Sequence, residues 1–88
     1  MTIHLSHRET DDRYHAEIVR HGRFRVVVCK DQLQWIVQRK KSGAGGRWQA
    51  LGYFLTRDAL IRLWTALDCP VGRVIIELPP VFRRCKHG

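Results

Sequence analysis

The chain has 88 residues and a net charge of +8 with neutral histidines, from 16 Lys and Arg against 8 Asp and Glu. A domain of this size buries only about 60–65% of the surface that its unfolded chain exposes, which leaves little room for a deep catalytic pocket. Hydrophobic residues make up 44% of the chain, which is enough for a packed core and excludes general disorder. The apolar runs are far shorter than the ~20 residues of a transmembrane helix, and the N-terminus lacks a secretion signal, so we expect a small soluble domain.

The first 13 residues differ in charge from the rest of the chain. They carry three carboxylates, on Glu9, Asp11 and Asp12, against the two cations of Arg8 and Arg13. The excess of basic residues therefore belongs to the remainder of the chain. We expect a flexible N-terminal arm over residues 1–13 with a short strand at 3–5, a single folded domain over 14–82, and a basic tail over 83–88.

Most of the first half of the domain shows the alternation typical of β-strands, in four segments: residues 14–20, 23–29, 33–40 and 47–54. Short connections link them, including a tight turn at Gly22 and a glycine-rich loop over residues 42–46. Consecutive β-rich segments with short connections predict an antiparallel meander. Strict alternation puts Trp48 on the same face as Phe54, and Phe24 and Trp35 should share that face.

The periodicity changes after Thr56. Leu60, Leu63, Trp64 and Leu67 form one apolar stripe at helical spacing. Thr56 is a suitable N-cap for a helix over residues 57–67. The stripe should pack on the Phe24, Trp35 and Phe54 face of the sheet.

Residues 71–78 fit either a short helix or a strand, and the preceding Pro70 favours the helix. The predicted fold class is therefore α+β, with an antiparallel three- to four-stranded sheet packed on one main helix and a short second helix.

Neither a metal site nor a catalytic site is expected. The cysteines are dispersed and do not form a disulfide framework, which favours a reducing compartment such as the cytoplasm. The spacings His4-x-x-His7 and Cys85-x-His87 lack the four ligands of a structural zinc site, so we expect no metal or other cofactor. The sequence has no Gly-x-Ser-x-Gly motif and no carboxylate pair that should share a pocket with a histidine, so we expect no enzymatic activity.

The sheet face opposite the helix is the strongest candidate for a binding surface. Arginine and glutamine can hydrogen-bond phosphate oxygens and base edges, tyrosine can stack on a base, and arginine also suits carboxylates. A solvated basic face with no binding role is the alternative. With the adjoining loop residue Lys41, the candidate binding residues, expected to be exposed, are Arg23, Arg25, Gln34, Gln38, Lys40, Lys41, Arg47, Gln49 and Tyr53.

One segment, residues 47–59 (RWQALGYFLTRDA), resembles the third strand and helix start of the plant ethylene-response-factor DNA-binding domain. That family has Trp-x-x-Leu-Gly-x-Phe-x-Thr or close variants followed by an Ala-rich helix. Its three-stranded sheet on one helix also occurs in the arm-binding domains of phage-type integrases. In those families the sheet enters the major groove. The resemblance covers about 20 residues and implies DNA contacts by Arg23, Arg25, Gln34, Gln38 and Arg47.

The whole chain is similar in type to the compact orphan proteins of bacteriophages and other mobile elements of proteobacteria, including anti-CRISPR proteins. This likeness implies a non-catalytic inhibitor that engages a host defence nucleoprotein complex through a basic surface, in the cytoplasm of a bacterial host cell. The alternative is a sequence-tolerant DNA- or RNA-binding module that uses the outer face of its sheet. We expect no membrane partner, and an edge strand such as residues 14–20 could pair two copies in a homodimer.

Overall fold

The computed structural model describes residues 7–42 and 46–83. Within them lie the strands β1 (Glu17–His21), β2 (Phe24–Val28), β3 (Trp35–Lys40) and β4 (Trp48–Phe54), followed by the helices α1 (Arg57–Ala66) and α2 (Arg73–Ile76). The strands form one sheet in the order β1-β2-β3-β4, and all neighbours are antiparallel. The predicted α+β class and the meander are therefore confirmed. Among the described residues, neither helix is long or apolar enough to cross a membrane.

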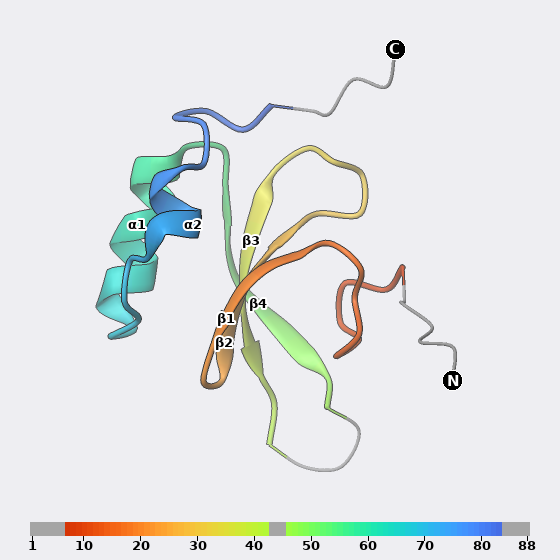
Figure 1. The fold of residues 1–88 in the computed structure, drawn as a ribbon. Coiled ribbons are helices and arrows are strands. Elements are labelled where there is room, and N and C mark those ends of the chain that lie inside the picture. Colours follow the sequence, from red (N-terminus) through yellow and green to blue (C-terminus); the bar gives the residue numbers. More distant parts are fainter. Residues whose placement is uncertain (1–6, 43–45, 84–88) are drawn as a thin grey trace.

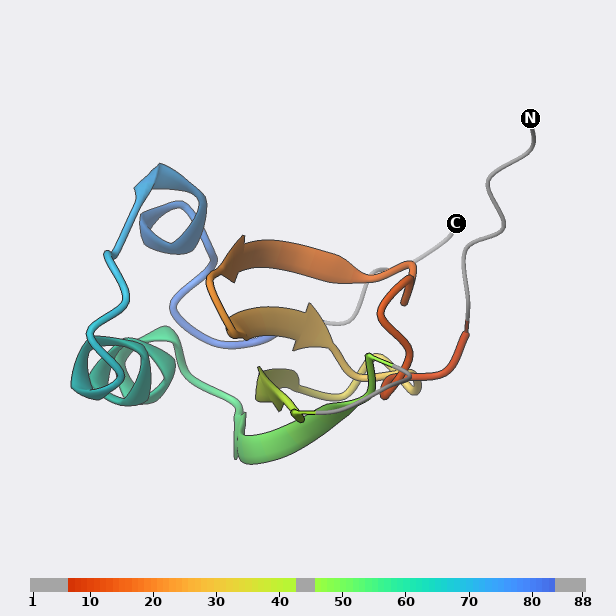
Figure 2. The same ribbon diagram turned by 90° about the horizontal axis from the view of Figure 1, so that it is seen from below.

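The molecule is layered around this sheet. Figure 1 shows α1 and α2 together on one side of the strands and the residues that precede β1 on the other. The view from below in Figure 2 shows the same arrangement, with the helices to the left of the strands and the N-terminal segment to the right. Both faces of the sheet are thus covered in part, one by helices and one by irregular chain.

The helix-side core follows the predicted stripe. Leu60 and Trp64 of α1 are fully buried against Trp35 and Val37 of β3. Helix α1 begins as expected, because the Thr56 side chain accepts a hydrogen bond from the Ala59 amide at 3.3 Å. The partly buried side chains packed against this core include Phe24, Phe54, Leu63 and Leu67.

The segment that fitted both helix and strand forms the short helix α2. Its Ile75 is buried in the same core, and α2 lies next to β1 while α1 packs on β3 and β4. The Arg57 guanidinium donates to the carbonyl oxygens of Ile76 and Leu78 at 2.9 and 2.8 Å, which ties the end of α2 to the start of α1. An isolated antiparallel β-bridge between Thr56 and Val81 also holds the segment after α2 beside the start of α1.

The first strand is shorter than predicted, since β1 begins at Glu17. Tyr14 instead anchors the approach to the sheet, with its hydroxyl donating to the Val28 carbonyl at 2.7 Å. The turn between β1 and β2 has Gly22 at φ +59°, where glycine is favoured. The strand expected at residues 3–5 and the centre of the glycine-rich loop lie outside the described residues.

A β-bulge in β4 overturns one prediction. Val37 pairs with Gly52 but Gln38 pairs with Ala50, so Leu51 is an extra residue in β4. Since side chains alternate along a strand, one extra residue moves everything before it to the opposite face. Trp48 therefore lies on the face opposite Phe54, and the expectation that the two share a face is wrong.

Candidate functional site

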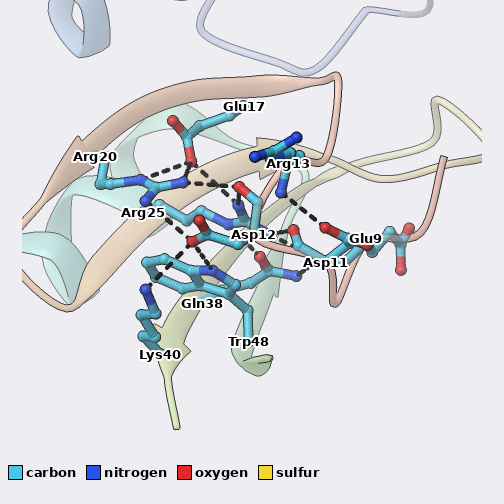
Figure 3. Close-up of polar contacts among 10 residues, drawn as sticks. All are labelled: Glu9, Asp11, Asp12, Arg13, Glu17, Arg20, Arg25, Gln38, Lys40 and Trp48. Atoms are coloured by element: carbon cyan, nitrogen blue, oxygen red, sulfur yellow. Dashed lines mark hydrogen bonds and ion pairs between the residues drawn. The ribbon is translucent and has the colours of Figure 1, made fainter. Parts of the chain in front are cut away.

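The outer face of the sheet is closed around a buried arginine. Arg25 of β2 is 0% exposed, although the sequence predicts it to be exposed. Its guanidinium donates to five acceptors: Gln38 Oε1 at 2.7 Å, Glu17 Oε1 at 3.1 Å, and the carbonyl oxygens of Glu9, Asp11 and Asp12 at 3.0, 2.8 and 3.3 Å (Figure 3). Burial lowers the pKa of Arg25, and the Glu17 carboxylate opposes that shift. All three guanidinium nitrogens are occupied inside the molecule.

Trp48 lies beneath this arginine at the start of β4. Its indole Nε1 donates to Asp12 Oδ1 at 3.0 Å, and its amide donates to the Thr10 carbonyl at 2.9 Å. The side chains of Arg20, Arg25 and Lys40 gather around the ring (Figure 3), with Arg25 Cζ 4.3 Å and Arg20 Cζ 5.0 Å from its centroid. These distances suit cation–π attraction.

Asp12 links the cations of this cluster. Its Oδ1 lies 3.1 Å from Arg20 Nη1 and 3.5 Å from Lys40 Nζ. The hydrogen bond from Trp48 lowers the pKa of Asp12 from its usual value of 3.8, and the two cations act in the same direction. The carboxylate is therefore the favoured form, and it holds residues 9–13 against the sheet.

Residues 9–13, which we name the strap, were expected to belong to a flexible arm. They instead dock on β2, β3 and β4 through the hydrogen bonds from Arg25 and Trp48 and through Gln38 Nε2, which donates to the Glu9 carbonyl at 2.8 Å. The physical reason is that a buried guanidinium or amide needs acceptors, and the strap carbonyls supply them. Arg25 and the 2% exposed Gln38 therefore do not form the open surface that was predicted. The acidic run ahead of basic strands was the signal for this docking.

An open basic surface does exist, at the end of the sheet where the β1–β2 turn meets the end of β3. Four basic side chains and one hydroxyl line a hollow of about 340 Å³ there: Arg23, Arg39, Lys40, Lys41 and Ser42. The Lys40 amide donates to the Arg23 carbonyl at 2.7 Å, which fixes the two sides of the hollow. Within the described part of the chain, no carboxylate forms an ion pair with Arg23, Arg39 or Lys41, whereas Lys40 pairs with Asp12. We name these five residues the basic hollow.

The sequence predicted three members of the basic hollow, Arg23, Lys40 and Lys41, and missed Arg39 and Ser42. Alternation assigns Arg39 to the helix side, because its strand neighbour Phe24 contributes to the helix-side core. Arg39 is nevertheless exposed, because it lies at the end of β3 beyond the part that α1 covers. The signal for Arg39 was its place in the run of basic residues at 39–41.

The other predicted binding residues are dispersed. Arg47 is connected to the hollow, since its carbonyl accepts from the Lys41 amide at 2.9 Å. It also lines a second hollow of about 330 Å³ with Arg8, Thr10 and Asp11. Gln49 is exposed, Gln34 is half-buried, and Tyr53 is 59% exposed on the outer face. None of these three lines either hollow.

The part of the chain that the structure describes contains no group of three His, Cys, Asp or Glu side chains that could hold a metal ion. Of the two fragments weighed as metal ligands, His4, Cys85 and His87 lie outside that part.

Comparison with protein-family models finds no matching family, and comparisons with curated proteins and with solved structures find no match. The geometry of the site is therefore the guide to its chemistry. That geometry presents guanidinium and ammonium groups to solvent around a hollow, and such groups bind phosphates and carboxylates.

Proposed function

We propose that the chain is a non-catalytic binding protein that holds the phosphate backbone of a nucleic acid, free or within a nucleoprotein complex, against the basic end of its sheet. The observation that carries this proposal is the basic hollow, where Arg23, Arg39 and Lys41 lie close together without a carboxylate partner among the described residues. Such like charges repel one another, and a polyanion relieves that repulsion. Phosphate contacts of this kind position a protein on nucleic acid without reading its sequence.

The position of the strap favours the basic end of the sheet as the contact surface and argues against the outer face. Insertion of the sheet into a major groove, as in the families that residues 47–59 resemble, needs an open outer face. Here Arg25 and Gln38 are buried under the strap. The basic hollow has no such cover.

The test is a charge reversal with a matched control. Arg23→Glu with Arg39→Glu alters the hollow, while Arg62→Glu with Arg73→Glu alters the exposed sides of the helices by the same total charge. Binding of labelled duplex and single-stranded DNA and RNA is measured by fluorescence anisotropy across a salt series. For duplex DNA we expect the hollow variant to lose affinity and its salt slope to shrink by about 2, because each phosphate contact contributes about 0.9.

The helix variant should lose far less affinity than the hollow variant. Equal losses in the two variants would mean that net charge alone sets binding. Absence of wild-type binding at low salt would refute the proposal.

The second candidate is the inhibitor of a host defence nucleoprotein complex. Exposed apolar side chains near β4 favour it, because Tyr53 and Leu55 are 59% and 58% exposed and a phosphate backbone offers them no apolar partner. Pull-down of bacterial effector complexes should retain the wild type, and Tyr53→Ala with Leu55→Ala should lose the complex while keeping nucleic-acid affinity. No captured complex and no protection of phage in a plaque assay would reject this candidate.

A further inference from the structure

The strap is held by polar groups alone. Its sequence, Glu-Thr-Asp-Asp-Arg, contains no apolar residue. Its links to the sheet are the carbonyl oxygens of Glu9, Thr10, Asp11 and Asp12, the Asp12 carboxylate, and the Glu9 carboxylate that accepts from the Lys30 amide. Undocking the strap therefore withdraws no apolar side chain of its own from either core.

The surface beneath the strap has the composition of a phosphate-binding surface. Arg20, Arg25 and Lys40 supply cations, Gln38 supplies an amide, and Trp48 supplies an aromatic ring. The Glu17 carboxylate of β1 pairs with Arg20 and Arg25 and offsets part of this positive charge. The acceptors that Arg25 finds in the strap are three neutral carbonyl oxygens. Phosphate oxygens are acceptors of the same geometry that also carry charge, so they add Coulombic attraction to hydrogen bonds whose donor is already ionised.

The chain has a fixed point directly after the strap. Tyr14 is buried in the outer-face cluster with Val27, Cys29 and Ile36, and its hydroxyl is bonded to the Val28 carbonyl at 2.7 Å. Residues before Tyr14 can therefore leave the sheet while this cluster stays closed. Thr10 and Asp11 of the strap also line an open hollow together with Arg8 and with Arg47, which directly precedes β4.

We propose that the strap is an internal competitor: residues 9–13 cover a second phosphate-binding surface, and a nucleic acid seated in the basic hollow displaces them to reach it. That surface consists of Arg20, Arg25, Gln38, Lys40 and Trp48. Lys40 connects the two sites, because it lines the basic hollow and also pairs with Asp12 at 3.5 Å. This inference rests on the proposed function, since it describes the regulation of that site.

The test weakens the strap without changing its size. Asp12→Asn removes the carboxylate that faces Arg20, Lys40 and Trp48, and Glu77→Gln, directly after α2, removes one negative charge elsewhere. We expect Asp12→Asn to bind DNA about tenfold more tightly than Glu77→Gln, the effect of one lost charge-assisted hydrogen bond. Cooperative melting of each variant verifies the fold, and Glu9→Gln, which frees the other end of the strap, serves if Asp12→Asn does not fold.

A second substitution, Arg20→Gln, should change DNA affinity in opposite directions in two backgrounds, which a change of net charge alone cannot produce. Arg20→Gln in the wild type loosens the strap and should leave DNA affinity unchanged or raised. The same substitution in Asp12→Asn removes a phosphate contact and should lower affinity by several-fold. A decrease of equal size in both backgrounds would overturn the inference.

The two proposals fail in different ways. If the wild type binds nucleic acid and Asp12→Asn matches Glu77→Gln, the strap is purely structural and the proposed function stands. If neither the wild type nor Asp12→Asn binds any of the nucleic acids, the proposed function itself is refuted. Binding by Asp12→Asn alone would refute the proposed function, which requires the wild type to bind through the basic hollow, and would show that the strap covers the second surface without being displaced.

Discussion

The two faces of the sheet are closed by different physical means. On the helix side, Trp35, Leu60 and Trp64 pack together and remove apolar surface from water. On the outer side, beyond a small apolar cluster, Arg25 and Trp48 are covered by the carbonyl and carboxylate oxygens of the strap. No buried polar side chain in the described residues lacks a hydrogen-bond partner. Basic residues on a sheet face are thus not necessarily exposed to solvent, because an acidic segment of the same chain can cover them and supply their hydrogen-bond acceptors.

The largest effect should come from the helix side. Trp64 is fully buried and its Nε1 donates to the Pro70 carbonyl at 2.9 Å. We expect Trp64→Ala to lower the free energy of unfolding by about 3–5 kcal/mol, which is a large part of the total for so small a domain. Guanidinium denaturation followed by circular dichroism measures it. The control Val74→Ala, at a half-exposed side chain, should stay within about 0.5 kcal/mol of the wild type.

The outer side should respond less, because its cover can move into water. Arg25→Met removes the donor for Gln38, Glu17 and three strap carbonyls. The strap can then undock, so that water donates to these acceptors in place of the guanidinium. We expect a loss of about 2 kcal/mol together with faster cleavage by trypsin after Arg13. Arg23→Met, at an exposed position, should change neither quantity. A loss as large as that of Trp64→Ala would show that the two faces unfold as one unit.

The last effect is a pH dependence of the outer side, which is absent at neutral pH. Burial of the phenol, and then the charge of Glu9, raise the pKa of Tyr14 from 10.0 to about 12. The folded state then holds a proton that the unfolded state releases, so stability is complete below pH 10 and falls as the pH rises to about 12. The difference in the free energy of unfolding between the wild type and Tyr14→Phe should therefore become smaller over this pH interval, as measured by denaturant titrations. A constant gap would contradict the shifted pKa.

Local chemistry accounts for the elements that could be predicted. Alternation gave the strands of the meander, and the stripe from Leu60 to Leu67 gave α1 with its cap at Thr56, because strand and helix periodicities are set by backbone geometry within a few residues. The apolar side of the sheet followed for the same reason. Alternation assigned Arg23 and Lys40 to the face opposite the helix, with Lys41 in the adjoining loop, and all three line the basic hollow.

The remaining features depend on contacts between residues far apart in the chain. The extra residue Leu51 turns Trp48 to the outer face, and no local preference at residues 48–54 specifies which residue bulges. Arg25 is buried because strap carbonyls 13–16 residues earlier meet its guanidinium, and Arg39 is exposed because α1 does not reach the end of β3. The sequence alone therefore determined which segments are strands and helices and where the positive charge lies. Which of those charges face solvent was decided by strand register and by the strap, since hydrogen bonds and burial form only when distant segments come together.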